Sequence, residues 1–170
     1  KSWGHNVFPY DIKGNFDYVV NLGGYVNHNE KTKTYNSHYK GCKNLADFFR
    51  KKNIISFIQI GSSVEYGPIK SPQSEIQNCS IKKLKSTYGK AKFLATKYLL
   101  GLFEKEKFPV TILRLYLVYG PNQDPNRLIS SVINSCLLKK KFPCSNGNQF
   151  RDFLYVDDLI NAITRCFGNS

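Results

Sequence analysis

Apolar and polar residues alternate along the chain in blocks that predict regularly spaced strands and helices. Residues 16–22 and 54–60 are two apolar runs rich in β-branched side chains, and each is followed directly by glycine. Such runs are typical of buried strands that end in tight turns. Between them, over about residues 35–52, apolar side chains recur every three or four positions with lysines between them, which predicts an amphipathic helix.

The second half of the chain repeats this alternation. The clearest helical stripe spans about residues 86–107, and a third apolar run follows at 110–116. A helix over 127–139, a short strand at 153–156 and a final helix capped by the aspartates 157–158 complete the series. Strands that alternate with helices are joined by right-handed crossovers, so we expect an α/β fold with a doubly wound, Rossmann-like parallel sheet.

The residues that follow these strands differ from those of an ordinary structural loop. Leu22 ends the first strand and Gly23 follows it, Ser62 and Ser63 follow the second, and Tyr116 closes the third. A structural loop would need only the glycines, whereas hydroxyls and aromatic rings also gather here. Because ligands of open parallel sheets bind beyond the carboxyl ends of the strands, we expect the functional site at this edge.

A tyrosine and a lysine four residues apart offer acid/base chemistry on one face of a helix. A lysine cation favours the phenolate and lowers the pKa of tyrosine from its usual value of about 10 toward neutrality. Of the three such pairs, only Tyr88 and Lys92 lie near the start of a long predicted helix that follows a strand ending in two serines. The other pairs are Tyr39/Lys43 and Tyr66/Lys70.

Composition and charge narrow the class of protein only slightly. The 170 residues, of which 41% are hydrophobic, suffice for one globular core. A net charge of +13 favours polyanionic partners, but arginine, the residue that phosphate recognition prefers, supplies only five of the 25 cations. The five cysteines are never spaced as C-x-x-C, which argues against a disulfide framework and a metal site. No segment approaches the roughly 18 apolar residues of a membrane span, so we expect a cytoplasmic protein.

The motifs taken together resemble those of the NAD-dependent epimerase/dehydratase family, the extended short-chain dehydrogenases/reductases that act on nucleotide sugars. The resemblance runs from about residue 17 to residue 167. The matching segments follow the family's order and include its S-S-x-x-V-Y-G turn and its Y-x-x-x-K helix. They are residues 17–24, 41–45, 62–67, 88–92, 113–121 and 151–158.

The resemblance implies a reaction and its catalytic residues. Tyr88 would be the general acid/base at a sugar hydroxyl or carbonyl, Ser62 would hydrogen bond to the same oxygen, and Lys92 would hold the nicotinamide ribose. The reaction would be hydride transfer at a sugar carbon, C4, by an epimerase or a ketosugar reductase. The helices near 39–52 and 86–107 would form a homodimer interface, as they do in the family.

The resemblance also implies binding residues for two ligands. Leu22, Gly23 and Tyr116 would join Tyr88 and Lys92 in binding NAD or NADP. Ser63 would join Ser62 in binding a nucleotide-diphosphate sugar, and Arg151 would contact its diphosphate because a planar cation with several donors suits that group.

Part of the family's pattern is not found in this sequence. The G-x-x-G-x-x-G loop, which lets the backbone approach the cofactor pyrophosphate, is missing. We therefore expect two strands and a helix to precede Lys1 and a substrate-binding segment to follow Ser170. Residues 1–170 would then form one partial dinucleotide-binding domain, in which about residues 121–170 begin the substrate-binding part.

Four positions bear on the reaction and the substrate. Dehydratases of the family carry an Asp-Glu pair directly after the serine or threonine of the strand-end motif, where this sequence has Ser63 and Val64. This difference favours an epimerase or a reductase over a 4,6-dehydratase. Glu65 follows one position later, and His38 stands where the family usually has asparagine.

Two further functions are compatible with the fold class. One is a reductase of a non-nucleotide ketone or aldehyde, against which Arg151 argues, since a small neutral substrate has no use for a diphosphate contact. The other is a noncatalytic nucleic-acid-binding protein, which the charge of +13 would suit. The presence of Ser62, Tyr88 and Lys92 argues against it, because a binding module has no need of an acid/base.

Overall fold

The computed structural model describes residues 12–77 and 79–167, and the chain divides into two compact units. The first unit contains the chain up to Leu115 together with the residues from Arg165 onward. The second unit is Tyr116–Thr164.

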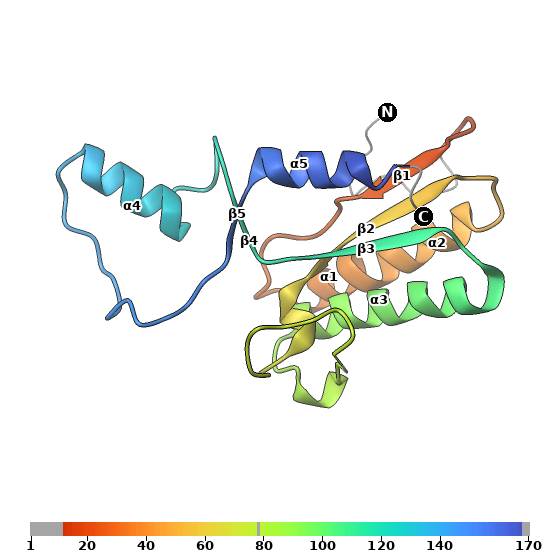
Figure 1. Cartoon of the computed structure of the whole chain (residues 1–170), viewed down its shortest axis with the longest axis horizontal. Coiled ribbons are helices and arrows are strands. Elements are labelled where there is room, and N and C mark those ends of the chain that lie inside the picture. The colour runs from red at the N-terminus through yellow and green to blue at the C-terminus, as the bar shows by residue number, and fades with distance from the viewer. Residues whose placement is uncertain (1–11, 78, 168–170) are drawn as a thin grey trace. The chain divides into compact units, whose positions relative to one another are not determined.

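A parallel sheet of three strands forms the centre of the first unit. Its order is β1 (Tyr18–Asn21), β2 (Ser56–Ser62) and β3 (Val110–Leu115), with β2 hydrogen bonded to both neighbours. Nearly every residue of β2 is buried, as expected for the middle strand of a parallel sheet. Since all three strands run the same way, their carboxyl ends lie at one edge of the sheet (Figure 1).

One continuous helical segment connects β1 to β2. It consists of α1 (Lys31–Tyr35), the π-helical turn η2 (Asn36–Gly41) and α2 (Cys42–Phe49). The long helix α3 (Thr87–Glu106) connects β2 to β3, and it lies on the same side of the sheet as α1 and α2 (Figure 1). The core between sheet and helices uses small and large side chains that are at most 1% exposed, namely Ala46, Phe49, Phe57, Ala95 and Leu99.

Two short 3₁₀ turns lie between β2 and α3. The first, η3 (Ser63–Tyr66), follows β2 directly, and the second is η4 (Ile81–Lys83). Ser86 then caps α3, because its hydroxyl accepts a hydrogen bond from the Gly89 N–H at 3.0 Å. This cap fixes the start of α3 at Thr87.

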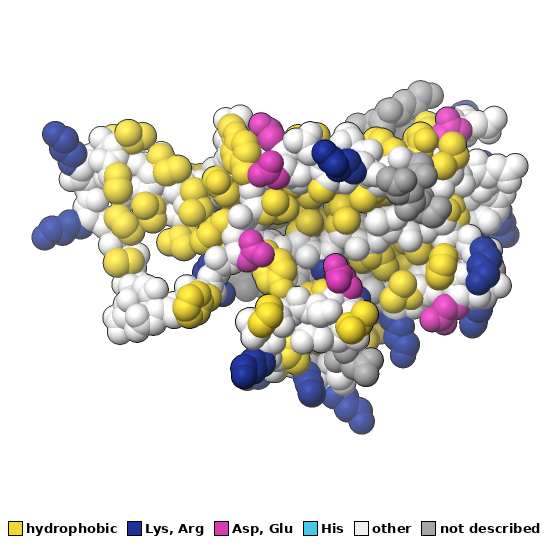
Figure 2. Space-filling view, in the orientation of Figure 1, with side chains coloured by type: hydrophobic (Ala, Val, Ile, Leu, Met, Phe, Trp, Pro, Cys, Tyr) yellow, Lys and Arg dark blue, Asp and Glu magenta, His cyan; other side chains and the backbone are white. Residues whose placement is uncertain are grey.

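The second unit contains a smaller parallel sheet and two helices. Its strands are β4 (Leu117–Tyr119) and β5 (Phe153–Tyr155), and its helices are α4 (Leu128–Leu137) and α5 (Val156–Arg165), whose last residue belongs to the first unit. Apolar side chains gather on the surface of α4 (Figure 2), where Leu137 is 76% exposed.

The parallel α/β fold predicted from the sequence is confirmed, with three local differences. The first helical segment begins at Lys31 rather than near residue 35, because its opening turn is polar and carries no apolar stripe. The apolar run predicted as one strand continues after Tyr116 into the separate strand β4. The last helix begins at Val156, so the two aspartates lie in its first turn instead of capping it.

Within the described residues, no helix combines the length and the apolar character needed to cross a membrane.

Candidate active site

The strand end that carries Ser62 is held in place by a capping box. Ser62 is the last residue of β2, and its hydroxyl accepts a hydrogen bond from the Val64 N–H at 3.5 Å. In return, the Ser62 N–H donates to Oε1 of Glu65 at 2.7 Å. The reciprocal bonds turn the chain sharply from strand to 3₁₀ turn and leave the Ser62 side chain 8% exposed at the carboxyl edge of the sheet.

Tyr88 lies next to this turn because α3 begins against it. Gly89 is buried, and a Cβ at its position would lie 3.7 Å from Cγ2 of Val64 and 3.1 Å from Oγ of Ser86. The first turn of α3 therefore packs against η3 at Val64, while the tight approach at Gly89 is to the capping hydroxyl of Ser86. This contact joins Gly89, the neighbour of Tyr88, to Val64, which follows Ser62 by two residues.

Two histidines contact the ring of Tyr88. His28 is stacked on it with a centroid distance of 4.1 Å and an interplanar angle of 15°, and His38 meets it edge-on at 4.9 Å and 82°. Both arrangements are favourable for aromatic rings. The ammonium of Lys92 lies 5.9 Å from the centroid of the Tyr88 ring, so the predicted Tyr/Lys pair does share one helix face.

Lys92 is a buried cation. Its side chain is 5% exposed, and Nζ donates a hydrogen bond to the carbonyl of Ile60 in β2 at 2.7 Å. Burial lowers the pKa of Lys92, while the negative charge of Glu65 acts in the opposite direction. The bond to Ile60 fixes the lysine beside the strand end that carries Ser62.

His38 links the loop after β1 to Tyr88. Its Nε2 lies 3.1 Å from the Tyr25 carbonyl, and because a carbonyl only accepts, Nε2 carries the proton and donates. Burial, together with the Lys92 charge, lowers the pKa of His38 to about 4, so the ring is neutral at pH 7. The loop that contains the predicted cofactor residues is thereby fastened to the helix turn beside Tyr88.

The predicted residues after β1 lie at the expected edge of the sheet. Leu22 is 68% exposed, and Gly23 follows it with its N–H donating to Oδ1 of Asn21 at 3.2 Å. A side chain at Gly23 would bring Cβ within 3.2 Å of the same oxygen, so the turn after β1 is tight at this position.

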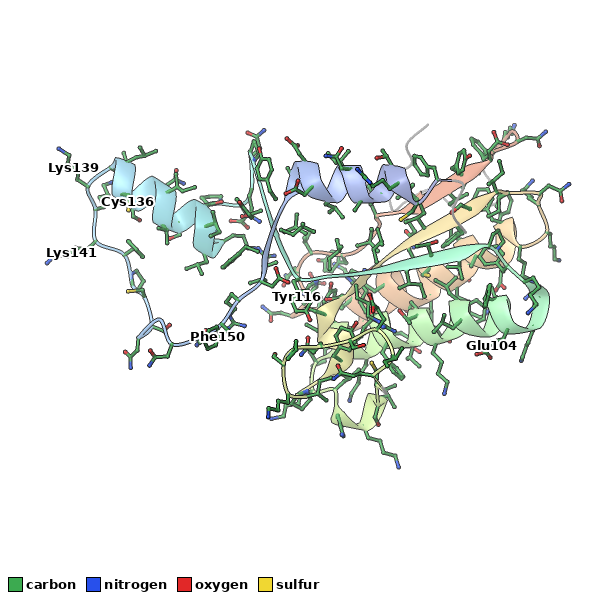
Figure 3. The ribbon with its side chains drawn as sticks, viewed as in Figure 1. Glu104, Tyr116, Cys136, Lys139, Lys141 and Phe150 are labelled. Carbon is green, nitrogen blue, oxygen red and sulfur yellow. The ribbon has the colours of Figure 1, made fainter. Side chains whose placement is uncertain are left out.

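Tyr116 and Arg151 belong to the second unit. Tyr116 directly follows β3 (Figure 3) and is 38% exposed. Arg151 is exposed in the segment before β5, and its Nη2 donates to Oε1 of Gln149 at 2.7 Å. The structure thus brings together Ser62, Tyr88 and Lys92 in the first unit, with Leu22 and Gly23 at the same sheet edge.

Two residues of this site were not predicted from the sequence. The ring of His28 contacts Tyr88 from an irregular loop, and no spacing in the sequence signals that contact. Glu65 does have a signal, because Ser62 and Glu65 form the S-x-x-E pattern of a capping box. The other two Tyr/Lys pairs have different partners: Lys43 pairs with Asp47 in α2, and the ring of Tyr66 packs against Arg114.

Comparison with known proteins decides the family. The model of the NAD dependent epimerase/dehydratase family matches residues 11–169. The chain belongs to this family.

Individual members of the family agree with this assignment. The uncharacterized UDP-glucose epimerase YtcB of Bacillus subtilis is 31% identical over 130 residues, which cover 76% of this chain and 40% of that protein. The human dTDP-D-glucose 4,6-dehydratase is 32% identical over 125 residues, covering 72% and 35%. The crystal structure of UDP-glucuronic acid 4-epimerase from Bacillus cereus in complex with NAD has a TM-score of 0.76 at 26% identity, over 87% of this chain and 48% of the other.

The chain spans less than half the length of these relatives, since it covers 40% and 35% of the two sequences and 48% of the solved structure. The named members include both epimerases and a dehydratase, so family membership leaves the reaction to be argued from the residues of the site.

Proposed function

We propose that this chain belongs to an NAD-dependent nucleotide-sugar epimerase or ketosugar reductase that transfers hydride at a sugar carbon, C4. The observation that carries the proposal is the arrangement of Tyr88 and Lys92 on one face of α3. Lys92 is fastened to the end of β2 by the Ile60 carbonyl, and the turn that carries Ser62 packs on the start of α3. An ordinary solvated lysine would be exposed, whereas this one is 5% exposed.

The residues at this edge fit a dinucleotide. A buried ammonium is costly unless hydrogen bonds satisfy its donors. Within residues 12–77 and 79–167, the Ile60 carbonyl accounts for one of the three donors of Lys92. A ribose hydroxyl would suit the remaining donors, and Leu22, Gly23, Tyr88 and Tyr116 would complete the contacts to the cofactor. NAD, when bound, would accept and return the hydride.

The catalytic roles follow from the chemistry of the three side chains. Tyr88 would take a proton from the sugar hydroxyl or give one to the carbonyl at its phenolic oxygen. The Lys92 ammonium would stabilise the phenolate form of Tyr88. Ser62, held by its capping box, would hydrogen bond to the same sugar oxygen and orient it toward Tyr88.

We propose the substrate contacts from the positions of this chain that match the family's motifs. Ser62 and Ser63 would bind the sugar, and Arg151 would bind the diphosphate of the nucleotide sugar. Arg151 is exposed and its guanidinium bonds only to a neutral amide in the described part of the chain, so it has charge available for an anion. We further propose that residues 121–170 begin the substrate-binding part of the protein.

The contacts of Glu65 favour an epimerase or reductase over a 4,6-dehydratase. Elimination of water needs an acid and a base after Ser62, and Ser63 and Val64 supply neither. Glu65, the next carboxylate, is 0% exposed and bonds to the Ser62 backbone and to Arg114. It is therefore engaged within the fold and would not act on a substrate.

Two further properties belong to the proposal. We propose a homodimer through α2 and α3, supported by the apolar side chains that α3 leaves exposed, Leu100 at 42% and Phe103 at 47%. We also propose a cytoplasmic location, supported by the five described cysteines, none of which forms a disulfide, as is usual in a reducing compartment.

Ligand-induced stabilisation of the full-length protein tests the proposed function. The melting temperature is measured with NAD, NADP and a panel of UDP-, CDP-, GDP- and dTDP-sugars, because a ligand bound only to the native state raises it. We expect a shift with NAD and with one nucleotide sugar. Arg151→Ala should abolish the sugar shift and keep the NAD shift, while Arg127→Ala in the same unit keeps both. No shift with either dinucleotide would overturn the proposal and favour a noncatalytic binding protein.

A further inference from the structure

Glu65 is a completely buried carboxylate that the proposed reaction does not use. Its side chain is 0% exposed. A carboxylate removed from water is costly unless it is paired and hydrogen bonded, so its partners show what it does in the fold.

Each carboxylate oxygen of Glu65 has its own partner. Oε1 accepts the N–H of Ser62 at 2.7 Å, and Oε2 accepts Nε of Arg114, a residue of β3, at 3.3 Å. Glu65 therefore ties the end of β2, where the proposed substrate-binding serine lies, to the neighbouring strand. A rotation of Ser62 away from the sheet would break a buried, charge-assisted hydrogen bond.

The same carboxylate lies near the ammonium of Lys92. A Cβ at Gly61 would be 2.8 Å from Oε1 of Glu65, so the carboxylate covers the backbone of Gly61. Nζ of Lys92 donates to the carbonyl of Ile60, the preceding residue of β2, at 2.7 Å. The carboxylate and the ammonium thus contact consecutive residues of β2, and both are buried.

Glu65 is the one anion among the described ionisable groups that act on Lys92. Cys42, from α2, faces Lys92, but burial raises the pKa of its thiol to about 12, so it is neutral. His38, from η2, is neutral because its pKa is lowered to about 4. Tyr88 approaches from α3 itself, and Arg114 from β3 is a cation that faces Glu65. Glu65, which also pairs with Arg114, is therefore the described carboxylate whose negative charge acts on Lys92.

We propose that Glu65 is a positioning residue of this active site, which orients Ser62 through its backbone N–H and supplies a negative charge that favours the ammonium of Lys92. The inference rests on the proposed function for its catalytic meaning, and it adds a residue whose side chain contacts neither cofactor nor substrate. If Glu65 served packing alone, the protonation of Lys92 would not depend on its charge.

The test separates charge from shape with Glu65→Gln. Glutamine keeps a carbonyl oxygen for the Ser62 N–H and loses the charge. The readout is the titration of Lys92 by NMR in the full-length protein labelled with ¹³C,¹⁵N-lysine, the signal being assigned with Lys92→Arg. We expect the pKa of Lys92 to fall by about one unit or more in Glu65→Gln, since a nearby opposite charge has an effect of that size.

Two variants serve as controls. Glu104→Gln removes an exposed carboxylate from the last turn of α3, the helix that carries Lys92 (Figure 3). This variant should leave the Lys92 titration unchanged. Glu65→Asp keeps the charge and should keep the pKa of Lys92 close to that of the wild type. If Glu65→Gln does not fold, Glu65→Asp still tests the proposal, since a shift of a full unit in this charge-conserving variant would overturn it.

Turnover is measured in parallel. The alkaline limit of kcat/KM should move to lower pH in Glu65→Gln by the same amount as the Lys92 titration. An unchanged Lys92 titration in folded Glu65→Gln overturns the proposal. A wild-type protein that binds no dinucleotide and turns over no nucleotide sugar overturns the proposed function instead, and the NMR titration distinguishes the two failures.

Discussion

The imidazole of His38 occupies the space that a side chain at Gly24 would need. A Cβ at position 24 would lie 2.1 Å from Cε1 and 2.6 Å from Nδ1 of His38. The ring is 7% exposed and is held there by its bond to the Tyr25 carbonyl. The large side chain of His38 in η2 therefore depends on the absence of a side chain at Gly24. Together the two residues set how closely the loop after β1 approaches Tyr88.

Gly24→Ala should be destabilising for this reason. We expect the free energy of unfolding to fall by about 1–3 kcal/mol, the usual cost of overfilling a packed site. In a His38→Asn background, which replaces the imidazole with a smaller side chain, the same change should cost much less. Urea denaturation of the four proteins in this cycle measures the coupling.

The control for this cycle is Gly101→Ala. A Cβ at this position in α3 meets nothing within 4 Å, so the change should leave stability equal or slightly higher. Equal effects of Gly24→Ala in both backgrounds would show that His38 does not fill the space.

His38 should also make stability depend on pH. Its pKa is lowered to about 4 in the fold, whereas an unfolded chain takes up the proton near the ordinary value of 6.5. The folded state therefore binds fewer protons between these values, and stability is lost as pH falls from about 6.5 to about 4. We expect His38→Asn to reduce that loss by about 2–3 kcal/mol.

Denaturation midpoints of wild type and His38→Asn, measured from pH 7.5 down to pH 4, test this expectation. The difference between the two proteins should grow in the variant's favour as the pH falls. Parallel curves would mean that His38 is protonated as easily in the fold as in the unfolded chain.

The proposed dimer predicts that an exposed ring of α3 is a contact residue. Phe103 is 47% exposed, and a charge there would have to be buried in the interface. Phe103→Glu should shift the full-length protein from dimer to monomer in sedimentation equilibrium. The matched control is Phe150→Glu in the second unit (Figure 3), where the ring is fully exposed and the change should leave the dimer intact. A protein that is monomeric before any substitution contradicts the dimer.

Hydrophobic periodicity predicted the strands and helices that bury a continuous face. The pattern of apolar residues was clear for β2 and α3, which are the middle strand and the longest helix of the first unit. The pattern did not predict α1, because its sequence is polar and Thr34 is its one buried residue. It also missed β4, because the apolar run continues through Tyr116 with no glycine or proline to mark the break.

Sequence motifs predicted those parts of the site whose residues lie close together along the chain. The spacing of Tyr88 and Lys92 could be read from the sequence because it is local to one helix. The stacking of His28 on Tyr88 and the fit of His38 against Gly24 could not, because each joins residues at least ten positions apart in the sequence through tertiary packing. The exact partners of Glu65 were equally hidden, since Arg114 comes from a strand 49 residues away.

The central claim is that Tyr88 is the acid/base of a hydride-transfer reaction on a nucleotide sugar, and Tyr88→Phe tests it most directly. The substitution removes one oxygen and keeps the ring between His28 and His38. In the full-length protein we expect kcat to fall by about 100-fold or more, while the stabilisation by NAD and by the nucleotide sugar is retained. Tyr39→Phe, which alters a Tyr/Lys pair of the same spacing in a different helix, should keep full activity. Turnover by Tyr88→Phe at the wild-type rate would contradict the account.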